Sequence, residues 1–498
     1  MSISITERSG VLRRSMGAAA LWLFLGGVGL VTVAAAVFGS SPVDAVLPAL
    51  IGAILYATVR VPLRWSAIAL LAILLTVDGP ADGAGLWHSP FVALGEWLQN
   101  ASALRLSGIE WIAIFLLGVH VFRGATGAQI DGSNRLPTAR ILRDFLFLYV
   151  VGTIFIYVNG LLRGGDLALW KLRNLLQVPL LFLLFNAAFR GPLDHPILGR
   201  VIIFAALVRS AFAVWVQYVV APRATGGPVD FATSHADSAL FTVSVILLLS
   251  TLIERGRPAL RQVLWFLPPV LIGIVANRRR LAWIMLLISL AVMWRVNPKT
   301  AWKRRIRRSA ILAIPIAALY VAVGWGSSAS LFAPLNAFRT VSGTTDLSTL
   351  WRDIENWNIS MSIREGPVIG IGLGQEYTEV MYNGEMSRAY AEYRAWPHNS
   401  VLGLLLFGGL LGFTAIWLPH AVTVFLAVRS CRFALLPEDR TASVACLAAI
   451  IAVMILAYGD LGLNLMECRV FMALAMAVTG KLAVATGAWP CRSPPAQT

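Results

Sequence analysis

Trp396-Pro397-His398-Asn399-Ser400-Val401-Leu402-Gly403-Leu404 opens an apolar run that extends to about Val428. A helix of roughly 20 apolar residues is enough to cross the hydrocarbon core of a membrane. The residues in front of the run place one titratable imidazole, that of His398, at the mouth of this predicted span. We interpret His398 as a candidate general base held on a rigid element. The alternative is that His398 and Asn399 only cap the helix, as small polar residues often do.

The composition of the whole chain predicts a membrane protein. Hydrophobic residues make up 58% and charged residues 13% of the 498 residues, and apolar runs of span length recur along nearly all of the chain. The period-two alternation of a membrane β-barrel is absent, so we expect an all-α, polytopic transmembrane helical bundle of about 12–14 spans. We divide the chain into N-terminal transmembrane helices (1–325), a large loop (326–397), C-terminal transmembrane helices (398–487) and a disordered tail (488–498).

The formal net charge of +16 is compatible with nucleic acid, anionic lipid or an anionic substrate as partner. We do not expect nucleic acid, because the chain has no basic soluble domain and no platform of interleaved aromatic and basic residues. The four cysteines show no spacing that suggests a metal site or a disulfide framework. Membrane lipids and an anionic substrate remain as expected partners, and we expect no metal and no cofactor.

Basic loops predict the orientation of the chain. The densest one follows the span that ends near Trp294, and it faces the cytoplasm because short loops rich in Lys and Arg rarely cross the membrane. Counting from this anchor places both termini in the cytoplasm, with an uncleaved first span before Phe38. It also places the segment 326–397 and the mouth of the His398 helix on the extracytoplasmic side.

This orientation leaves positive charges on the outer side, where they should be scarce. They are Arg278, Arg279 and Arg280 at one turn, Arg163, Lys171 and Arg173 at another, and Arg352, Arg364, Arg388 and Arg394 in the large loop. Guanidinium groups match phosphate oxygens in a bidentate fork, so several of them converging would hold a diphosphate. The alternative is that these side chains reach lipid headgroups; for the adjacent triple Arg278–Arg280 we favour the substrate.

The large loop contains two further patterns. Trp351–Ile363 is typical of an amphipathic helix at the membrane interface, ended by Gly366-Pro367. Gly370, Gly372 and Gly374 then alternate with apolar residues. This run lacks the strand, helix and lysine of a phosphate-binding loop, so we expect it to let the loop fold back tightly towards His398.

These residues together resemble the superfamily of O-antigen ligases and polymerases, which are polytopic glycan transferases. The resemblance rests on Arg352, Trp357, Gly366-Pro367, the glycine run 370–374, His398–Leu402 and the Phe407–Gly412 segment, with Arg280-Leu281-Ala282-Trp283 similar to the family's arginine motif at the start of a span. Two positions depart from the family pattern. The serine before the motif arginine is Arg279 here, so either Arg279 or Arg280 could hold the functional position, and Phe407 replaces an acidic residue.

The resemblance implies a metal-independent, inverting glycosyl transfer at the outer face of the bacterial inner membrane. The donor would be a glycan on a polyprenyl diphosphate, the acceptor a hydroxyl of a lipid or of another glycan, and no ATP would be needed. His398 would be the catalytic base, with Asn399, Gly370, Gly372 and Gly374 in support. The residues expected to bind the diphosphate are Arg280, Arg279 and Arg352, with Arg173 as a weaker fourth.

Three alternatives remain. A polymerase of the same superfamily must seat two lipid-linked glycans, so two separate cationic clusters would favour it, whereas the single dense cluster Arg278–Arg280 favours a ligase. A transporter or flippase of lipid-linked oligosaccharides would show charged or broken helices within the membrane and internal repeats. In the sequence the ionisable residues gather at span ends instead, and we interpret Asp460 and Glu467 as caps of short helices. A channel lacks any charged ring.

Overall fold

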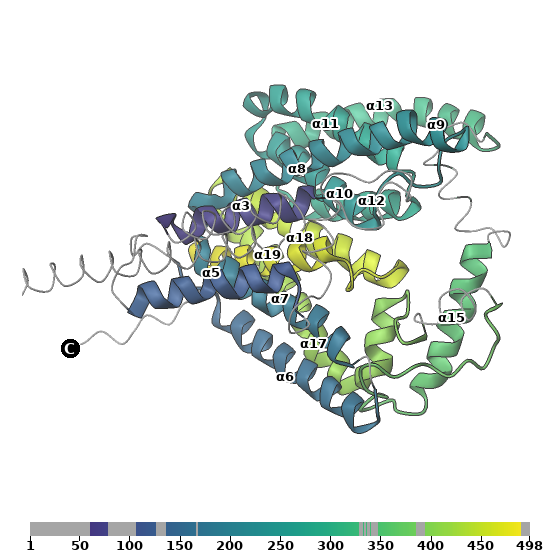
Figure 1. Ribbon diagram of the computed structural model, residues 1–498. Coiled ribbons are helices and arrows are strands. Elements are labelled where there is room, and N and C mark those ends of the chain that lie inside the picture. Colours follow the sequence, from purple (N-terminus) through teal and green to yellow (C-terminus); the bar gives the residue numbers. More distant parts are fainter. Residues whose placement is uncertain are drawn as a thin grey trace, which may run out of the picture. The chain divides into compact units, whose positions relative to one another are not determined.

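The computed structural model describes residues 60–77, 106–125, 136–165, 168–327, 332, 335, 339, 347–384 and 394–489. All regular structure in these ranges is helical, which confirms the all-α prediction (Figure 1). Nine helices within them are long and apolar enough to cross a membrane, in agreement with a multi-pass membrane protein. The predicted first span, Arg388 and nearly all of the predicted tail lie outside the described residues.

The chain divides into two compact units, one of residues 1–66 and 119–131 and the other of residues 67–118 and 132–498. In the smaller unit, the Arg123 guanidinium donates a hydrogen bond to the Val61 carbonyl at 3.1 Å. Two helices, α3 (Leu63–Thr76) and α5 (Gly108–Ala125), have residues in both units. All the predicted site residues belong to the larger unit, which therefore contains the whole candidate site.

The larger unit is a bundle of long helices. In chain order they are α6 (Arg140–Leu162), α7 (Ala168–Ala188), η3 (Pro192–Asp194), α8 (His195–Trp215), η4 (Val216–Val220), α9 (Ala221–Thr225), α10 (His235–Arg255), α11 (Arg257–Asn277), α12 (Arg280–Val296), α13 (Ala301–Gly324), α15 (Leu347–Ile363), α17 (Ser400–Phe433), α18 (Pro437–Gly459) and α19 (Met466–Ala485). The predicted amphipathic helix is thus present as α15.

The helices of the bundle differ in how much of their surface is buried. α10 and α19 are almost entirely buried, and α10 packs against α8, α11, α12 and α18. α13 exposes large apolar side chains such as Leu312, Ile316 and Leu319 along its length. An exposed apolar surface of this kind suits a lipid environment, because in water it would carry a large free-energy cost.

The long helix α17 is interrupted at Gly409, whose backbone is not helical (φ 56°, ψ −163°). The glycine run of the loop fills this interruption. The amides of Ile371 and Gly372 donate to the carbonyls of Leu406 and Phe407, both at 2.9 Å, and the Leu373 amide donates to Ile156 of α6 at 3.1 Å. Since unpaired backbone groups are costly in a low-dielectric interior, the loop satisfies the carbonyls that the broken helix releases.

Only glycine fits these close approaches. Gly370 has a positive φ of 72°, and a Cβ there would collide with the backbone of Phe407. The glycine run therefore anchors the loop to α17 and α6, and its amides at Ile371, Gly372 and Leu373 are used in that anchoring.

Gly370→Ala should destabilise the protein more than Gly164→Ala. Both glycines have a positive φ, 72° and 79°, but the added methyl group meets the Phe407 backbone in the first case and open space in the second. Backbone strain alone costs about 1–3 kcal/mol, and the collision adds to it only at Gly370. The melting temperature of the detergent-solubilised chain measures the difference, and equal shifts for the two variants would contradict this account of the docked loop.

Candidate active site

His398 lies just before α17, and its neighbour performs the capping. The Asn399 side chain accepts a hydrogen bond from the Leu402 amide at 3.1 Å, as an N-cap does. The His398 imidazole points instead to Glu355 of α15, with Nδ1 3.1 Å from Oε2 and 3.3 Å from Oε1. The His398 amide also donates to Glu355 Oε1 at 3.1 Å. His398 is thus held from both its ring and its backbone.

Glu355 sets the hydrogen-bonding state of the imidazole. Its side chain is only 1% exposed, against 15% for His398. Because a carboxylate only accepts hydrogen bonds, Nδ1 carries the hydrogen, and a neutral ring then presents its lone pair at Nε2. A buried carboxylate that orients a histidine in this way is the arrangement of a general base. Glu355 was not among the residues predicted from sequence, because its pairing with His398 spans 43 residues.

Arg352 lies one helical turn before Glu355 on α15. Its Nη1 donates to the Gly459 carbonyl at 2.5 Å, and its Nη2 lies 3.7 Å from Asp460 Oδ2. α15, which packs against α17, therefore joins two places: His398 at the start of α17 and the turn between α18 and α19. In the sequence, only the spacing of three residues between Arg352 and Glu355 indicated that the two side chains lie on the same side of a helix.

A second histidine meets the same turn. His235, the first residue of α10, has Nε2 at 2.8 Å from Asp460 Oδ2 and at 2.7 Å from Nη1 of Arg279. Nε2 donates to Asp460 only when it carries a hydrogen, and it accepts from Arg279 only when it does not. The two contacts are therefore alternatives that depend on whether Nε2 carries a hydrogen, which in the neutral ring is set by the tautomer of His235. No motif in the sequence had singled out His235.

Arg279 and Arg280 take different positions. Arg278 has a left-handed backbone (φ 56°) that ends α11, and Arg279 follows as the N-cap residue of α12. The Arg279 guanidinium lies 3.8 Å from the centroid of the Phe231 ring and donates to the Thr233 carbonyl at 3.1 and 3.3 Å. The Arg280 side chain, in the first turn of α12, is exposed. Of the two arginines left open by the motif, the structure brings Arg279 to His235.

Asp460 is more than the helix cap that the sequence suggested. It ends α18 and accepts the Leu461 amide at 2.8 Å, but α18 and α19 are long helices of 23 and 20 residues. Burial acts to raise the pKa of Asp460, yet His235 and Arg352 outweigh it and hold the pKa below its ordinary value. Asp460 is thus a buried, charged counter-ion of Arg352.

Lys171 and Arg173 do not lie on a turn, contrary to the prediction from sequence. Both belong to the first two turns of α7, which begins at Ala168. The Arg173 side chain is 8% exposed, and its Nε lies 3.7 Å from Oε1 of the buried Glu110. Arg173, the weaker fourth candidate for the diphosphate, is therefore engaged by a carboxylate of α5.

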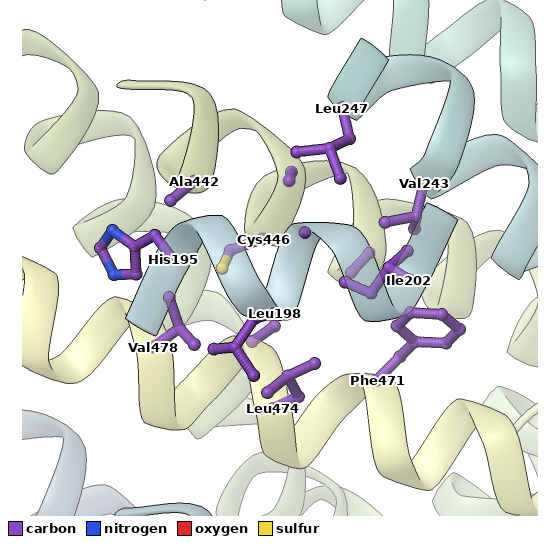
Figure 2. Close-up of a pocket in the computed structure, with 14 residues that line it drawn as sticks. His195, Leu198, Ile202, Val243, Leu247, Ala442, Cys446, Phe471, Leu474 and Val478 are labelled. Atoms are coloured by element: carbon purple, nitrogen blue, oxygen red, sulfur yellow. The ribbon is translucent and has the colours of Figure 1, made fainter. Parts of the chain in front are cut away.

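Other cavities and clusters in the described residues offer less chemistry. No three histidine, cysteine or acidic side chains gather there as a metal site would require. An apolar pocket with an empty volume of about 470 Å³ lies between α8, α10, α18 and α19, with His195 at one end (Figure 2). His195 pairs with Asp439 at 3.2 Å, in the first turn of α18. Asp460 lies at the opposite end of that helix, about 30 Å away at 1.5 Å per residue.

No protein-family model matches the chain, and no curated protein is similar enough in sequence to match it. The resemblance to the O-antigen ligase superfamily therefore stays a prediction from motifs.

Asp460→Asn should lower the stability of the protein, because it leaves the Arg352 charge without its buried counter-ion. We expect a loss of about 1–3 kcal/mol, moderated by the partial exposure of Arg352. Asp353→Asn, the same chemical change at an exposed position of α15, should shift stability by no more than about 0.5 kcal/mol. Melting temperatures in detergent test the pair, and an equal shift for both variants would refute the role of Asp460.

Proposed function

We propose that this chain is a membrane glycosyltransferase of the bacterial inner membrane. It would transfer a glycan from a polyprenyl-diphosphate carrier to a hydroxyl acceptor at the extracytoplasmic face, as an O-antigen ligase does. The observation that carries the proposal is the pairing of His398 with the buried Glu355, on a helix that also directs Arg352 towards Asp460. The motif resemblance and the multi-pass helical architecture support it.

In this proposal His398 is the general base. Glu355 holds Nδ1–H, so Nε2 takes the proton of the acceptor hydroxyl as its oxygen attacks the anomeric carbon. The bond between this carbon and the diphosphate oxygen breaks on the opposite face, which inverts the configuration. General-base assistance of this kind contributes about 10²- to 10⁴-fold to the rate, and the Glu355 carboxylate stabilises the imidazolium that forms.

Arg279 and Arg352 are the proposed ligands of the diphosphate leaving group. Negative charge grows on the diphosphate as the bond breaks, and fixed guanidinium groups stabilise it best where water is scarce. In the described structure Asp460 partly neutralises Arg352 and contacts His235 next to Arg279. A diphosphate would take over part of the role of this carboxylate. Arg280 and Arg173 rank below them, because Arg280 is exposed and Arg173 is beside Glu110.

A transporter of the same lipid-linked substrate is the second candidate, and two observations favour it. α17 is broken at Gly409, and broken helices are frequent in transporters. Arg209, in α8, is fully buried and holds Asp237 of α10 through contacts of 2.7–3.0 Å. Arg209, within the span 192–225, corrects the expectation that ionisable residues gather at span ends, whereas Asp237 is in the first turn of α10. The glycine run, however, fills the break in α17, which suits a fixed support better than a moving gate.

His398→Ala should reduce glycan transfer by about 10²- to 10⁴-fold, because the general base is lost. Glu355→Gln should cause a smaller loss, since Gln still accepts from Nδ1–H but does not stabilise an imidazolium. The assay follows product formation by the purified chain in detergent, with undecaprenyl-diphosphate-linked glycan and an acceptor. A transporter only moves its substrate from one compartment to another, and detergent removes the compartments, so a transporter would form no product in this assay. Full activity of His398→Ala would leave His398 without a catalytic role.

Arg279→Ala should impair transfer far more than Arg280→Ala, although the two residues are adjacent. We expect a loss of about 10²- to 10³-fold for Arg279→Ala, as for the removal of a charge-stabilising donor, and a rate close to wild type for Arg280→Ala. The same detergent assay measures both variants. If Arg280→Ala lost more activity than Arg279→Ala, the diphosphate would instead bind on the exposed side of α12.

A further inference from the structure

Lys171 is buried beside the segment that leads to His398. Only 4% of Lys171 is exposed, and its Nζ has no hydrogen-bond partner among the residues that the structure describes. The ammonium group lies 5.0 Å from the centroid of the Trp396 ring and 5.3 Å from that of Phe407. The faces of aromatic rings attract a cation, but they do not replace the hydrogen bonds that an ammonium group makes in water.

A pocket lies at this ammonium group. The empty space in it is about 430 Å³, part of which is open to solvent. Most of its lining is apolar, and its polar lining side chains are Lys171, Ser400 and Asn464. A mainly apolar pocket with one buried cation suits a ligand that carries an anionic group on an apolar body.

Among the residues that the structure describes, no carboxylate contacts the ammonium group of Lys171 directly. Burial lowers the pKa of Lys171 to about 7, and the attraction of Glu376 offsets this only in part. The Glu376 carboxylate forms an ion pair with Arg394, at 3.2 Å. Arg173, two residues along α7, is beside Glu110. A buried cation without a hydrogen-bonded partner is costly to maintain, so a ligand anion at this place would supply what the protein does not.

The Lys171 pocket and the Arg279–Arg352 cluster lie on different sides of the turn between α18 and α19. Asp460, at the start of the turn, directs its carboxylate to Arg352 and His235, whereas Leu463 and Asn464 of the same turn line the pocket. Ser400 joins the two parts, since its hydroxyl accepts from the Leu463 amide and donates to the Asp460 carbonyl, both at 3.4 Å.

The segment that carries His398 contributes to the pocket directly. Trp396, Pro397 and Ser400 all line it, and His398 lies between them in the chain with its imidazole turned to Glu355. The proposed base is therefore next in the chain to residues that line the pocket, and it pairs with Glu355 on the helix that carries Arg352.

We propose that the Lys171 pocket is a second phosphate-binding subsite, which holds the phosphate of a lipid-linked acceptor. The inference rests on the proposed transfer reaction and deepens it: both substrates carry a phosphate on a lipid, one at Arg279 and Arg352 and the other at Lys171. Two separate cationic places are what a polymerase of lipid-linked glycans requires, so this subsite favours a polymerase over a ligase.

The test counts the undecaprenyl diphosphate molecules bound to the full chain in nanodiscs by native mass spectrometry. We expect two per wild-type chain and one for Lys171→Met, with the affinity of the lost site reduced at least tenfold. Arg279→Ala should also bind one. The melting temperature of Lys171→Met should equal or exceed that of wild type, because an isolated buried charge is replaced by an apolar side chain of similar length. Lower stability with unchanged binding would make Lys171 structural and overturn the inference.

Lys481→Met is the matched control. Lys481 is also buried, but its Nζ donates to the Leu136 carbonyl at 2.9 Å. This variant should lose stability and still bind two lipids. If it does not fold, Lys171→Arg serves instead: it keeps the charge and should bind the second lipid more tightly than Lys171→Met, and equal loss in both would contradict a role for the charge.

The variants separate this inference from the proposed function. If Lys171→Met still binds two lipids, the subsite is wrong and the transferase proposal stands. The same holds if wild type binds only one lipid and Arg279→Ala binds none. If Arg279→Ala changes nothing while Lys171→Met loses a lipid, the subsite stands and the assigned donor site fails. Two competitors identify the source of the anion. Phosphatidylglycerol and inorganic pyrophosphate should displace the lipid from the Lys171 site less effectively than undecaprenyl diphosphate does. If either competitor is equally effective, the assignment to a lipid-linked acceptor is overturned.

Discussion

The hydrogen bonds between the loop amides at 371–373 and the carbonyls of α17 and α6 are the constraint on which the candidate site depends. They close the break at Gly409, where the released carbonyls of Leu406 and Phe407 would otherwise be buried without donors. They also fix the end of the segment that follows α15. Because His398 lies at the start of α17 and Glu355 belongs to α15, one anchored loop holds both members of the histidine–carboxylate pair in register.

The sequence allowed the helical architecture and the position of His398 to be predicted, because both depend on local patterns. Apolar length indicates a span, and polar residues before a span indicate its mouth. The partners of His398 could not be found in this way. Glu355 is 43 residues away, and His235 meets Asp460 from a distant part of the chain, so only the packing of α10 against α18 reveals that pair.

Two further points, the choice that the motif left open between Arg279 and Arg280 and the misplacement of Lys171 and Arg173, also have specific physical causes. The left-handed backbone at Arg278 shifts the start of α12, so that Arg279 rather than Arg280 reaches His235. No residue pattern announces a positive φ at an arginine, which is rare outside glycine and asparagine. Lys171 and Arg173 were placed on a turn because charges usually mark loops. The helix α7 nevertheless starts before them and buries them.

Three of the positive charges that the orientation left unexplained are compensated by carboxylates within the protein. Arg352 faces Asp460, Arg173 faces Glu110, and Arg394 faces Glu376. These guanidinium groups point to carboxylates rather than only to lipid headgroups, so snorkelling does not account for them. A diphosphate arriving at Arg352 would therefore exchange one anion for another, and its net gain would depend on how far Asp460 turns to His235. Since His235 can donate to Asp460 only when Nε2 carries a hydrogen, the position of the hydrogen on the His235 ring would decide how readily the carboxylate releases Arg352.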